Sequence, residues 1–176
     1  MSMNGAIKKN FKKLLKKVLV VWPDEEYVML IHTKIPKRWA YLVEVVSYLK
    51  KNTEYDLTVM DCIDPLFSNG EILTKIASND YLCVILMSRF ETPGGIIKLS
   101  KWIKQIDPLV HIMIYGDLAG LIPNFFKRID SLDAIVTSGD WEVGISDYLS
   151  FLNKKILLSE VRGVEIRQEH EWIPAT

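Results

Sequence analysis

The chain has 176 residues, of which 49% are hydrophobic and 25% charged, and its formal net charge at pH 7 is zero. This length and composition are typical of one folded domain with a substantial core, and they exclude an intrinsically disordered chain. The longest apolar runs, such as residues 81–87, are too short to span a bilayer, and no secretory signal pattern is visible.

Charge is distributed unevenly along the chain. Residues 1–17 hold six lysines and no acidic residue, so the remainder is net acidic by six charges. An acidic body argues against general nucleic-acid binding, which needs a basic surface. The basic start predicts a solvated lead-in to the first strand, and an amphipathic helix that contacts a membrane or an acidic partner is the alternative. Cys62 and Cys83 fit no metal or redox spacing, so we expect buried free thiols and a cytoplasmic setting.

Apolar runs alternate with helical patterns along the whole chain. A continuous apolar run predicts a strand at 18–22, and 56–61, 81–87, 111–115 and 132–136 are predicted to be the next four strands. Helical spacing predicts a first helix that Pro36 opens, followed by helices at 71–77, 94–106, 123–129 and 141–152. In the first helix, the residues expected to face the core are Trp39, Leu42, Val43, Val46 and Leu49. Residues 156–167 predict one or two further strands that turn at Gly163, before a polar tail.

Five strand–helix units with short connections predict an α/β fold with a doubly wound parallel sheet. The flavodoxin-like strand order 2-1-3-4-5 is the expected topology, with a short C-terminal β extension. We predict a basic lead-in at 1–17, one α/β domain at 18–155, and a hairpin and tail at 156–176.

Small and polar residues follow four of the predicted strands and point to a ligand face. Ligands of open α/β sheets bind outside the carboxyl ends of the strands, and small residues there let a ligand approach the backbone. Three familiar sites are excluded. Pro23-Asp24-Glu25 after the first strand rules out dinucleotide-binding and phosphate-binding glycine loops, and residues 87–88 and 138–139 lack the aspartate and lysine of a phosphate-accepting receiver domain.

The titratable residues near the ligand face leave several readings open. The histidines at 32, 111 and 170 have no metal-ligand spacing, so we expect no metal site. His32 lies in the loop after the first strand, either as a ligand-face group or as an ordinary loop histidine. Asp117 and Asp140 form a candidate pair of acids, whereas Asp140 alone is also suited to cap the final helix.

Several segments together resemble the cobalamin (B12)-binding domain that precedes many radical S-adenosylmethionine enzymes. Residues 36–61 are similar to its first helix and to a second strand that ends in aspartate. Residues 84–88 resemble its third strand, which ends in serine, and residues 114–117 resemble its Gly-Gly turn. Residues 133–142, Asp-Ala-Ile-Val-Thr-Ser-Gly-Asp-Trp-Glu, are similar to its Asp-Ala-Val-Val-x-Gly-Glu-Gly-Glu motif, and residues 161–167 to the hairpin that follows.

The resemblance implies a domain that holds cobalamin against the carboxyl ends of its strands. The Asp-x-His-x-x-Gly motif that supplies an axial histidine is missing, which implies histidine-off cobalamin. The implied cofactor-binding residues are Pro23, Ser88, Thr92, Gly116, Asp117, Gly120, Ser138, Gly139, Asp140, Trp141 and Glu142. Asp117 and Trp141 stand where the family has glycine, and this narrows the room for a corrin ring or its tail.

The chain lacks the C-x-x-x-C-x-x-C motif, so it carries no iron–sulfur cluster of its own and we expect no catalysis by it alone. The leading hypothesis is a cobalamin-binding or cobalamin-derived module that works with a separate radical S-adenosylmethionine protein in methyl transfer. The alternative is an interaction or regulatory module of the same fold without a cofactor. A third hypothesis is a small hydrolase or transferase that uses Asp117, Asp140 or Glu142. Fold alone does not decide among them.

Overall fold

Helices and strands alternate along the chain, as the sequence pattern predicts. The computed structural model describes residues 17–23, 38–62, 68–89 and 92–174. The strands are β1 (Lys17–Trp22), β2 (Asp56–Asp61), β3 (Tyr81–Met87), β4 (His111–Tyr115), β5 (Ala134–Val136), β6 (Val164–Gln168) and β7 (Glu171–Pro174). The helices are α1 (Arg38–Asn52), α2 (Asn69–Ala77), α3 (Pro93–Ile106), α4 (Asp117–Leu121), α5 (Pro123–Phe126), α6 (Trp141–Leu152) and a 3-10 turn at Leu158–Glu160.

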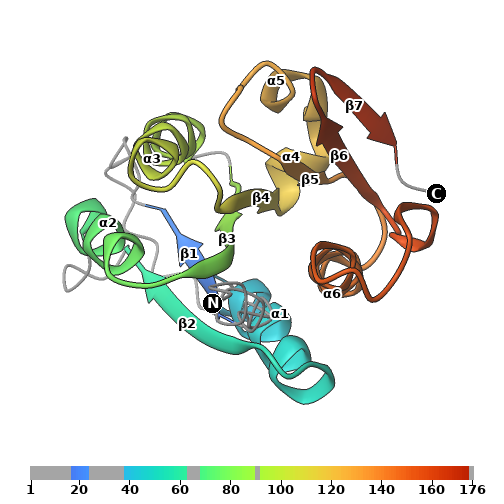
Figure 1. Cartoon of the computed structure of the whole chain (residues 1–176), viewed down its shortest axis with the longest axis horizontal. Coiled ribbons are helices and arrows are strands. Elements are labelled where there is room, and N and C mark those ends of the chain that lie inside the picture. The colour runs from blue at the N-terminus through green and yellow to red at the C-terminus, as the bar shows by residue number, and fades with distance from the viewer. Residues whose placement is uncertain (1–16, 24–37, 63–67, 90–91, 175–176) are drawn as a thin grey trace, which may run out of the picture.

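All seven strands belong to one mixed sheet in the order β2-β1-β3-β4-β5-β6-β7 (Figure 1). The first five are parallel, so the predicted α/β class and the 2-1-3-4-5 order are confirmed. The last two strands extend the sheet in antiparallel fashion, β6 beside β5 and β7 at the outer edge. The C-terminal β extension is therefore continuous with the main sheet.

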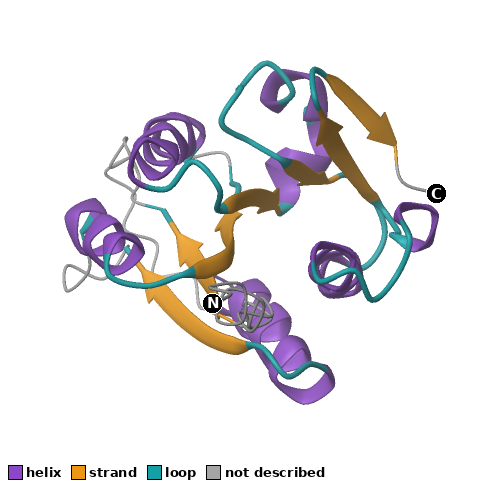
Figure 2. Ribbon diagram, viewed as in Figure 1, coloured by secondary structure: helices purple, strands orange, loops and turns teal. Residues whose placement is uncertain are grey.

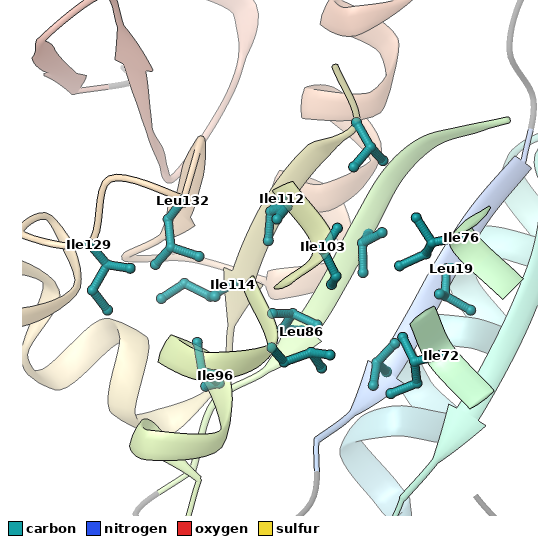
Figure 3. Packing of buried hydrophobic residues seen from close by; sticks show 14 of the residues in the cluster. Leu19, Ile72, Ile76, Leu86, Ile96, Ile103, Ile112, Ile114, Ile129 and Leu132 are labelled. Carbon is teal, nitrogen blue, oxygen red and sulfur yellow. The ribbon is translucent and has the colours of Figure 1, made fainter. Parts of the chain in front are cut away.

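Two layers of helices cover the sheet, α2 and α3 on one face and α1 and α6 on the other (Figure 2). Successive residues of a strand point to opposite faces, so Leu19 and Val21 of β1 enter one core while Val18 and Val20 enter the other. Figure 3 shows the α2–α3 core, in which Ile72, Ile76, Ile96 and Ile103 pack against strand residues. Burial on both faces explains why β3, and β1 from Val18 onward, are continuously apolar.

The first helix differs from the predicted pattern in one respect. Leu42 and Leu49 are buried as expected, but Val43 is 50% exposed and Val45 takes its place in the core at 1% exposure. The buried residues are spaced three and four apart, which is one narrow stripe of a helix. The predicted start at Pro36 lies outside the described residues, and so does the side chain of Trp39.

The C-terminal hairpin turns at a different place from the one predicted. Its two strands are β6 and β7, and they are joined at Glu169 and His170 rather than at Gly163. Residues 171–174, predicted to be a polar tail, therefore form an edge strand. Residues 117–121, which follow β4 and were predicted to be loop, form the short helix α4. The fifth strand begins at Ala134 rather than at residue 132.

One arginine anchors the hairpin to the segment that follows α5. Arg167 of β6 donates hydrogen bonds to the carbonyl oxygens of Lys127 and Ile129 at 2.9 and 3.0 Å. Its guanidinium group also lies over the Trp172 ring, 4.8 Å from the ring centroid. The Trp172 indole N–H donates to the same Lys127 carbonyl at 3.0 Å. These contacts fix β6 and β7 beside the parallel part of the sheet.

Candidate functional site

The carboxyl ends of β1, β3 and β4 lie side by side in the middle of the sheet. Met87 pairs in register with Tyr115, and the backbone N–H of Ser88 donates to the Tyr115 carbonyl oxygen at 2.7 Å. Trp22 ends the neighbouring strand β1. These strand ends form the edge at which ligands of this fold class bind, and we call it the carboxyl edge.

Three buried polar atoms at the carboxyl edge lack a hydrogen-bond partner. In the part of the chain that the structure describes, these are the indole nitrogen of Trp22 and the hydroxyl oxygens of Ser88 and Tyr115. All three side chains are at most 1% exposed. A buried polar group without a partner is destabilising, and it points to a missing ligand or water. Burial also raises the pKa of the Tyr115 phenol, so this hydroxyl keeps its proton and can donate it in a hydrogen bond.

Three aromatic rings fill the space between the first turns of α1 and α6. Trp141, the first residue of α6, packs edge-to-face against Tyr41 of α1 with ring centroids 5.2 Å apart. It packs in the same way against Tyr115, at 5.8 Å. We call Tyr41, Tyr115 and Trp141 the aromatic bridge. Its rings lie next to the orphaned hydroxyl of Tyr115 and close the α1–α6 face at the carboxyl edge.

Two glycines at this edge have different physical reasons to be glycine. Gly116 has a φ of +109°, and a Cβ there would lie 2.5 Å from the Ser88 carbonyl oxygen, so no side chain fits. Gly139 has a φ of +76°, but a Cβ would meet no atom within 4 Å. Gly139 therefore borders open space. Gly120 is unexceptional, because a Cβ would make an ordinary 3.5 Å contact with the Thr137 carbonyl oxygen.

Other predicted site residues serve the local backbone. The Thr92 hydroxyl is buried and accepts a hydrogen bond from the Arg89 backbone N–H at 2.9 Å, which closes the turn before α3. Pro23 is buried directly after β1, whereas Ser138 is exposed after β5. Asp140 occupies the N-cap position of α6, but its side chain makes no capping hydrogen bond. The predicted cap position is thus correct, while the expected capping contact is absent.

The candidate carboxylates lie at two helix starts. Asp117 is in the first turn of α4, and Asp140 and Glu142 flank the start of α6. Negative charge is favourable near helix N-termini, which accounts for these acids without any catalytic role. Among the described residues, no hydrogen bond or ion pair joins the three, and no group of three or more histidine, cysteine or acidic side chains could hold a metal. Asp24, Glu25 and His32 lie outside the described residues.

The sequence analysis missed four contributors to the carboxyl edge. Trp22, Tyr41 and Tyr115 had not been singled out, nor had Arg89, whose guanidinium carbon lies 5.5 Å from the centroid of the Trp22 ring. One signal was available in the sequence, because Trp22 and Tyr115 are aromatic residues that directly follow runs of non-aromatic apolar residues at the ends of their strands. The two cysteines are buried thiols outside any disulfide, as predicted. No helix among the described residues is long and apolar enough to cross a membrane.

Comparisons with known proteins support the fold class. No family model and no curated protein matches the sequence. The radical S-adenosylmethionine methyltransferase TsrM from Kitasatospora setae is similar in structure, with a TM-score of 0.67, 15% identity, and coverage of 91% of this chain and 30% of TsrM. The cobalamin-dependent S-adenosylmethionine radical enzyme OxsB has a TM-score of 0.67 and 17% identity, with coverage of 92% and 22%.

A response regulator receiver protein from Sinorhizobium medicae is more distant, with a TM-score of 0.51 and 16% identity over 80% of this chain. The chain therefore has a flavodoxin-like α/β fold. More particularly, it has the fold found in part of TsrM and of OxsB, and it spans less than a third of the length of either enzyme.

Proposed function

We propose that this chain is a cobalamin-binding or cobalamin-derived module that works with a separate radical S-adenosylmethionine protein of the methyltransferase type. The observation that carries the proposal is the set of orphaned buried polar atoms on Trp22, Ser88 and Tyr115 at the carboxyl edge. The fold shared with part of OxsB, described as cobalamin-dependent, supports it. The 176-residue sequence has two cysteines, at 62 and 83, so within this proposal the partner supplies the iron–sulfur cluster of the radical enzyme.

The residues at the carboxyl edge suit the rim of a corrin ring. A corrin carries flexible amide arms, which both donate and accept hydrogen bonds. The Ser88 and Tyr115 hydroxyls and the Trp22 indole N–H would bind such arms. Gly139 borders open space, so the backbone after β5 would pass close to the ring.

Within this proposal the chain binds and orients the cofactor and performs no chemistry itself. When bound, cobalamin supplies methyl-transfer chemistry at its cobalt. Gly116 holds the turn after β4 in a conformation that only glycine adopts against the Ser88 carbonyl, which keeps the rim-binding groups in place. The edge-to-face packing of Trp141 on Tyr115 fixes the orientation of the Tyr115 ring and hence of its hydroxyl.

Titration of the purified protein with hydroxocobalamin tests the proposal. We expect a saturable change in the visible spectrum, and the binding stoichiometry should approach one corrin per chain. Replacing Gly139 by valine should weaken binding, because the side chain would enter the open space beside the ring. Thr92→Val is the matched control, since among the described residues the Thr92 hydroxyl hydrogen bonds with the backbone of Arg89, in the turn before α3. No spectral change at high micromolar cofactor would contradict a cofactor role.

A module of the same fold without cofactor is the second candidate. The aromatic bridge favours it, because Tyr41, Tyr115 and Trp141 fill part of the space that a ligand would need. The two candidates separate in one experiment. Stable association with a radical S-adenosylmethionine protein in the absence of any corrin, together with a silent titration, would favour the cofactor-free module.

A further inference from the structure

We infer that the carboxyl edge prefers a corrinoid that lacks the nucleotide base, such as cobinamide, over intact cobalamin. This inference rests on the proposed function and specifies its ligand. It follows from a distinction between the two parts of cobalamin. The amide arms of the corrin are slim and flexible, whereas the nucleotide tail ends in a planar aromatic base about the size of an indole.

Among the described residues, the side chains on the α1–α6 face leave no space for such a base. The aromatic bridge already places three rings there, and the Tyr115 side chain is fully buried. Trp22 and Met87 lie in the same core and are each 1% exposed. Protein interiors are close-packed, so a further ring enters only if one of these rings leaves.

The opposite face of the sheet is closed as well. There α4 begins immediately after Gly116, and its residues Leu118 and Ala119 are 5% and 0% exposed. Gly116 itself lies against the Ser88 carbonyl oxygen so closely that no Cβ fits between them. A base on this face would have to displace backbone, which is harder than displacing a side chain.

The orphaned polar atoms are compatible with this picture. The hydroxyl groups of Ser88 and Tyr115 need a hydrogen-bonding group, not a ring, to satisfy them. A corrin amide arm supplies such a group and carries no ring. The aromatic bridge and the orphaned hydroxyls thus select for the corrin rim and against the nucleotide tail.

Trp141 is more able to move than Tyr115, because Trp141 is half-buried whereas Tyr115 is fully buried. To admit a base, Trp141 would have to break its edge-to-face contacts with both Tyr41 and Tyr115. The loss of two such contacts corresponds to a preference of about tenfold or more. Trp141 is therefore the residue that we assign to corrinoid specificity.

The test compares the affinities of diaquocobinamide and hydroxocobalamin for the full chain by visible spectroscopy, in wild type and in Trp141→Ala. The wild-type protein should bind diaquocobinamide about tenfold more tightly than hydroxocobalamin, or more. Part of that ratio is the cost of detaching the base from cobalt, and this part is the same in both proteins. In Trp141→Ala the ratio should fall by about tenfold, while Trp102→Ala, which removes a 40% exposed tryptophan from α3, should leave it unchanged.

Each outcome decides one statement. Equal affinities in wild type, or tighter binding of cobalamin, would overturn the inference and leave the cofactor proposal standing. A preference for cobinamide that Trp141→Ala does not reduce would overturn the role of the aromatic bridge. If neither corrinoid binds, the proposed function fails, and the inference fails with it. Circular dichroism of the variants confirms that each one folds, and the wild-type comparison needs no variant.

Discussion

Tyr115, the last residue of β4, packs edge-to-face against Trp141, the first residue of α6, with ring centroids 5.8 Å apart. This contact joins the end of a central strand to the helix that follows the neighbouring strand β5. Because Trp141 also packs on Tyr41, a single side chain connects α1, α6 and the sheet at the carboxyl edge. The same contact therefore contributes to stability and shapes the candidate site.

Trp141→Ala should lower the free energy of unfolding by about 2 kcal/mol. This loss is smaller than that expected for replacing a fully buried tryptophan, because Trp141 is only half-buried. Urea unfolding followed by circular dichroism measures the change. Trp102→Ala should cost less, since Trp102 is 40% exposed and lies on α3 at the other face. Equal losses in the two variants would mean that the ring contacts of Trp141 contribute nothing beyond those of an ordinary surface tryptophan.

Two glycines with similar backbone angles should respond differently to alanine. Gly163 and Gly139 have φ values of +64° and +76°, so alanine is strained at either position. At Gly163, a Cβ would also lie 2.1 Å from the Ser138 carbonyl oxygen, whereas at Gly139 it would meet nothing. We expect Gly139→Ala to cost about 1 kcal/mol and Gly163→Ala clearly more, as measured by chemical denaturation. A larger loss for Gly139→Ala would contradict the assignment of Gly163 to close approach.

Two arginine ion pairs form a second matched comparison. Arg167 pairs with Asp130 at 3.1 Å, but its side chain is only 14% exposed and also binds two carbonyl oxygens and the Trp172 ring. Arg167→Lys should destabilise the hairpin by about 2 kcal/mol, because lysine cannot reproduce the planar set of donors. Hydrogen exchange of the β6 and β7 amides would localise the effect.

Arg162→Lys serves as the control. Arg162 pairs with Asp147 at 2.7 Å, but its side chain is 68% exposed, and exposed ion pairs contribute little to stability. Its replacement should leave hydrogen exchange in β6 and β7 close to wild type. Comparable losses in the two variants would indicate that the carbonyl and ring contacts of Arg167 are not what holds the hairpin.

The strand order could be predicted from the sequence because it depends on regular patterns. Residues 56–61, 81–87 and 111–115 are strands with the predicted bounds. The clearest signal is in 81–87, because a parallel strand that is buried on both faces is apolar throughout. The hairpin turn was misplaced because Gly163 looks like a turn residue, but the structure uses it for close approach to Ser138. The actual turn includes Glu169, a non-glycine residue with a φ of 55°, which no composition signal marks.

The candidate site was harder to predict than the fold. The loops that follow the strands could be read in order along the chain, and Ser88, Gly116 and Gly139 do lie at the carboxyl edge. The aromatic bridge could not be predicted from the sequence. Tyr41 and Trp141 lie a hundred residues apart in the chain, and they meet only because α1 and α6 pack on the same face of the sheet. Hydrogen-bond satisfaction, which distinguishes Ser88 from other serines, is likewise a property of the folded state.

Stability should fall as the pH drops below about 6.5, because burial lowers the pKa of His111. His111 begins β4 and contacts the Tyr148 hydroxyl at 3.3 Å, with Asp133 and Lys104 as the nearby charged groups and Cys83 also buried in the same region. Below this pH, His111 binds a proton more readily in the unfolded chain than in the folded chain. Acid therefore favours unfolding. His111→Gln should flatten the decline in unfolding free energy between pH 7.5 and pH 5.

His170→Gln is the control for this pH dependence, because His170 is exposed in the turn between β6 and β7. It should leave the pH profile unchanged. If both variants keep the wild-type decline, then groups other than His111 account for the acid sensitivity.

Ser88 and Ser100 are both fully buried, but only the Ser100 hydroxyl has a side-chain partner, the Ser131 hydroxyl at 2.7 Å. Ser88→Ala removes an orphaned polar atom and should raise the free energy of unfolding by about 1 kcal/mol, whereas Ser100→Ala breaks a buried hydrogen bond and should lower it by a similar amount. Urea denaturation of the corrin-free protein measures both changes in stability.

If the Ser88 hydroxyl binds a corrin arm, Ser88→Ala should at the same time weaken corrin binding several-fold, and Ser100→Ala should not. A stabilised variant with weaker binding is the expected result for a residue retained for a ligand, and a destabilised Ser88→Ala would show that the hydroxyl is already satisfied in the free protein.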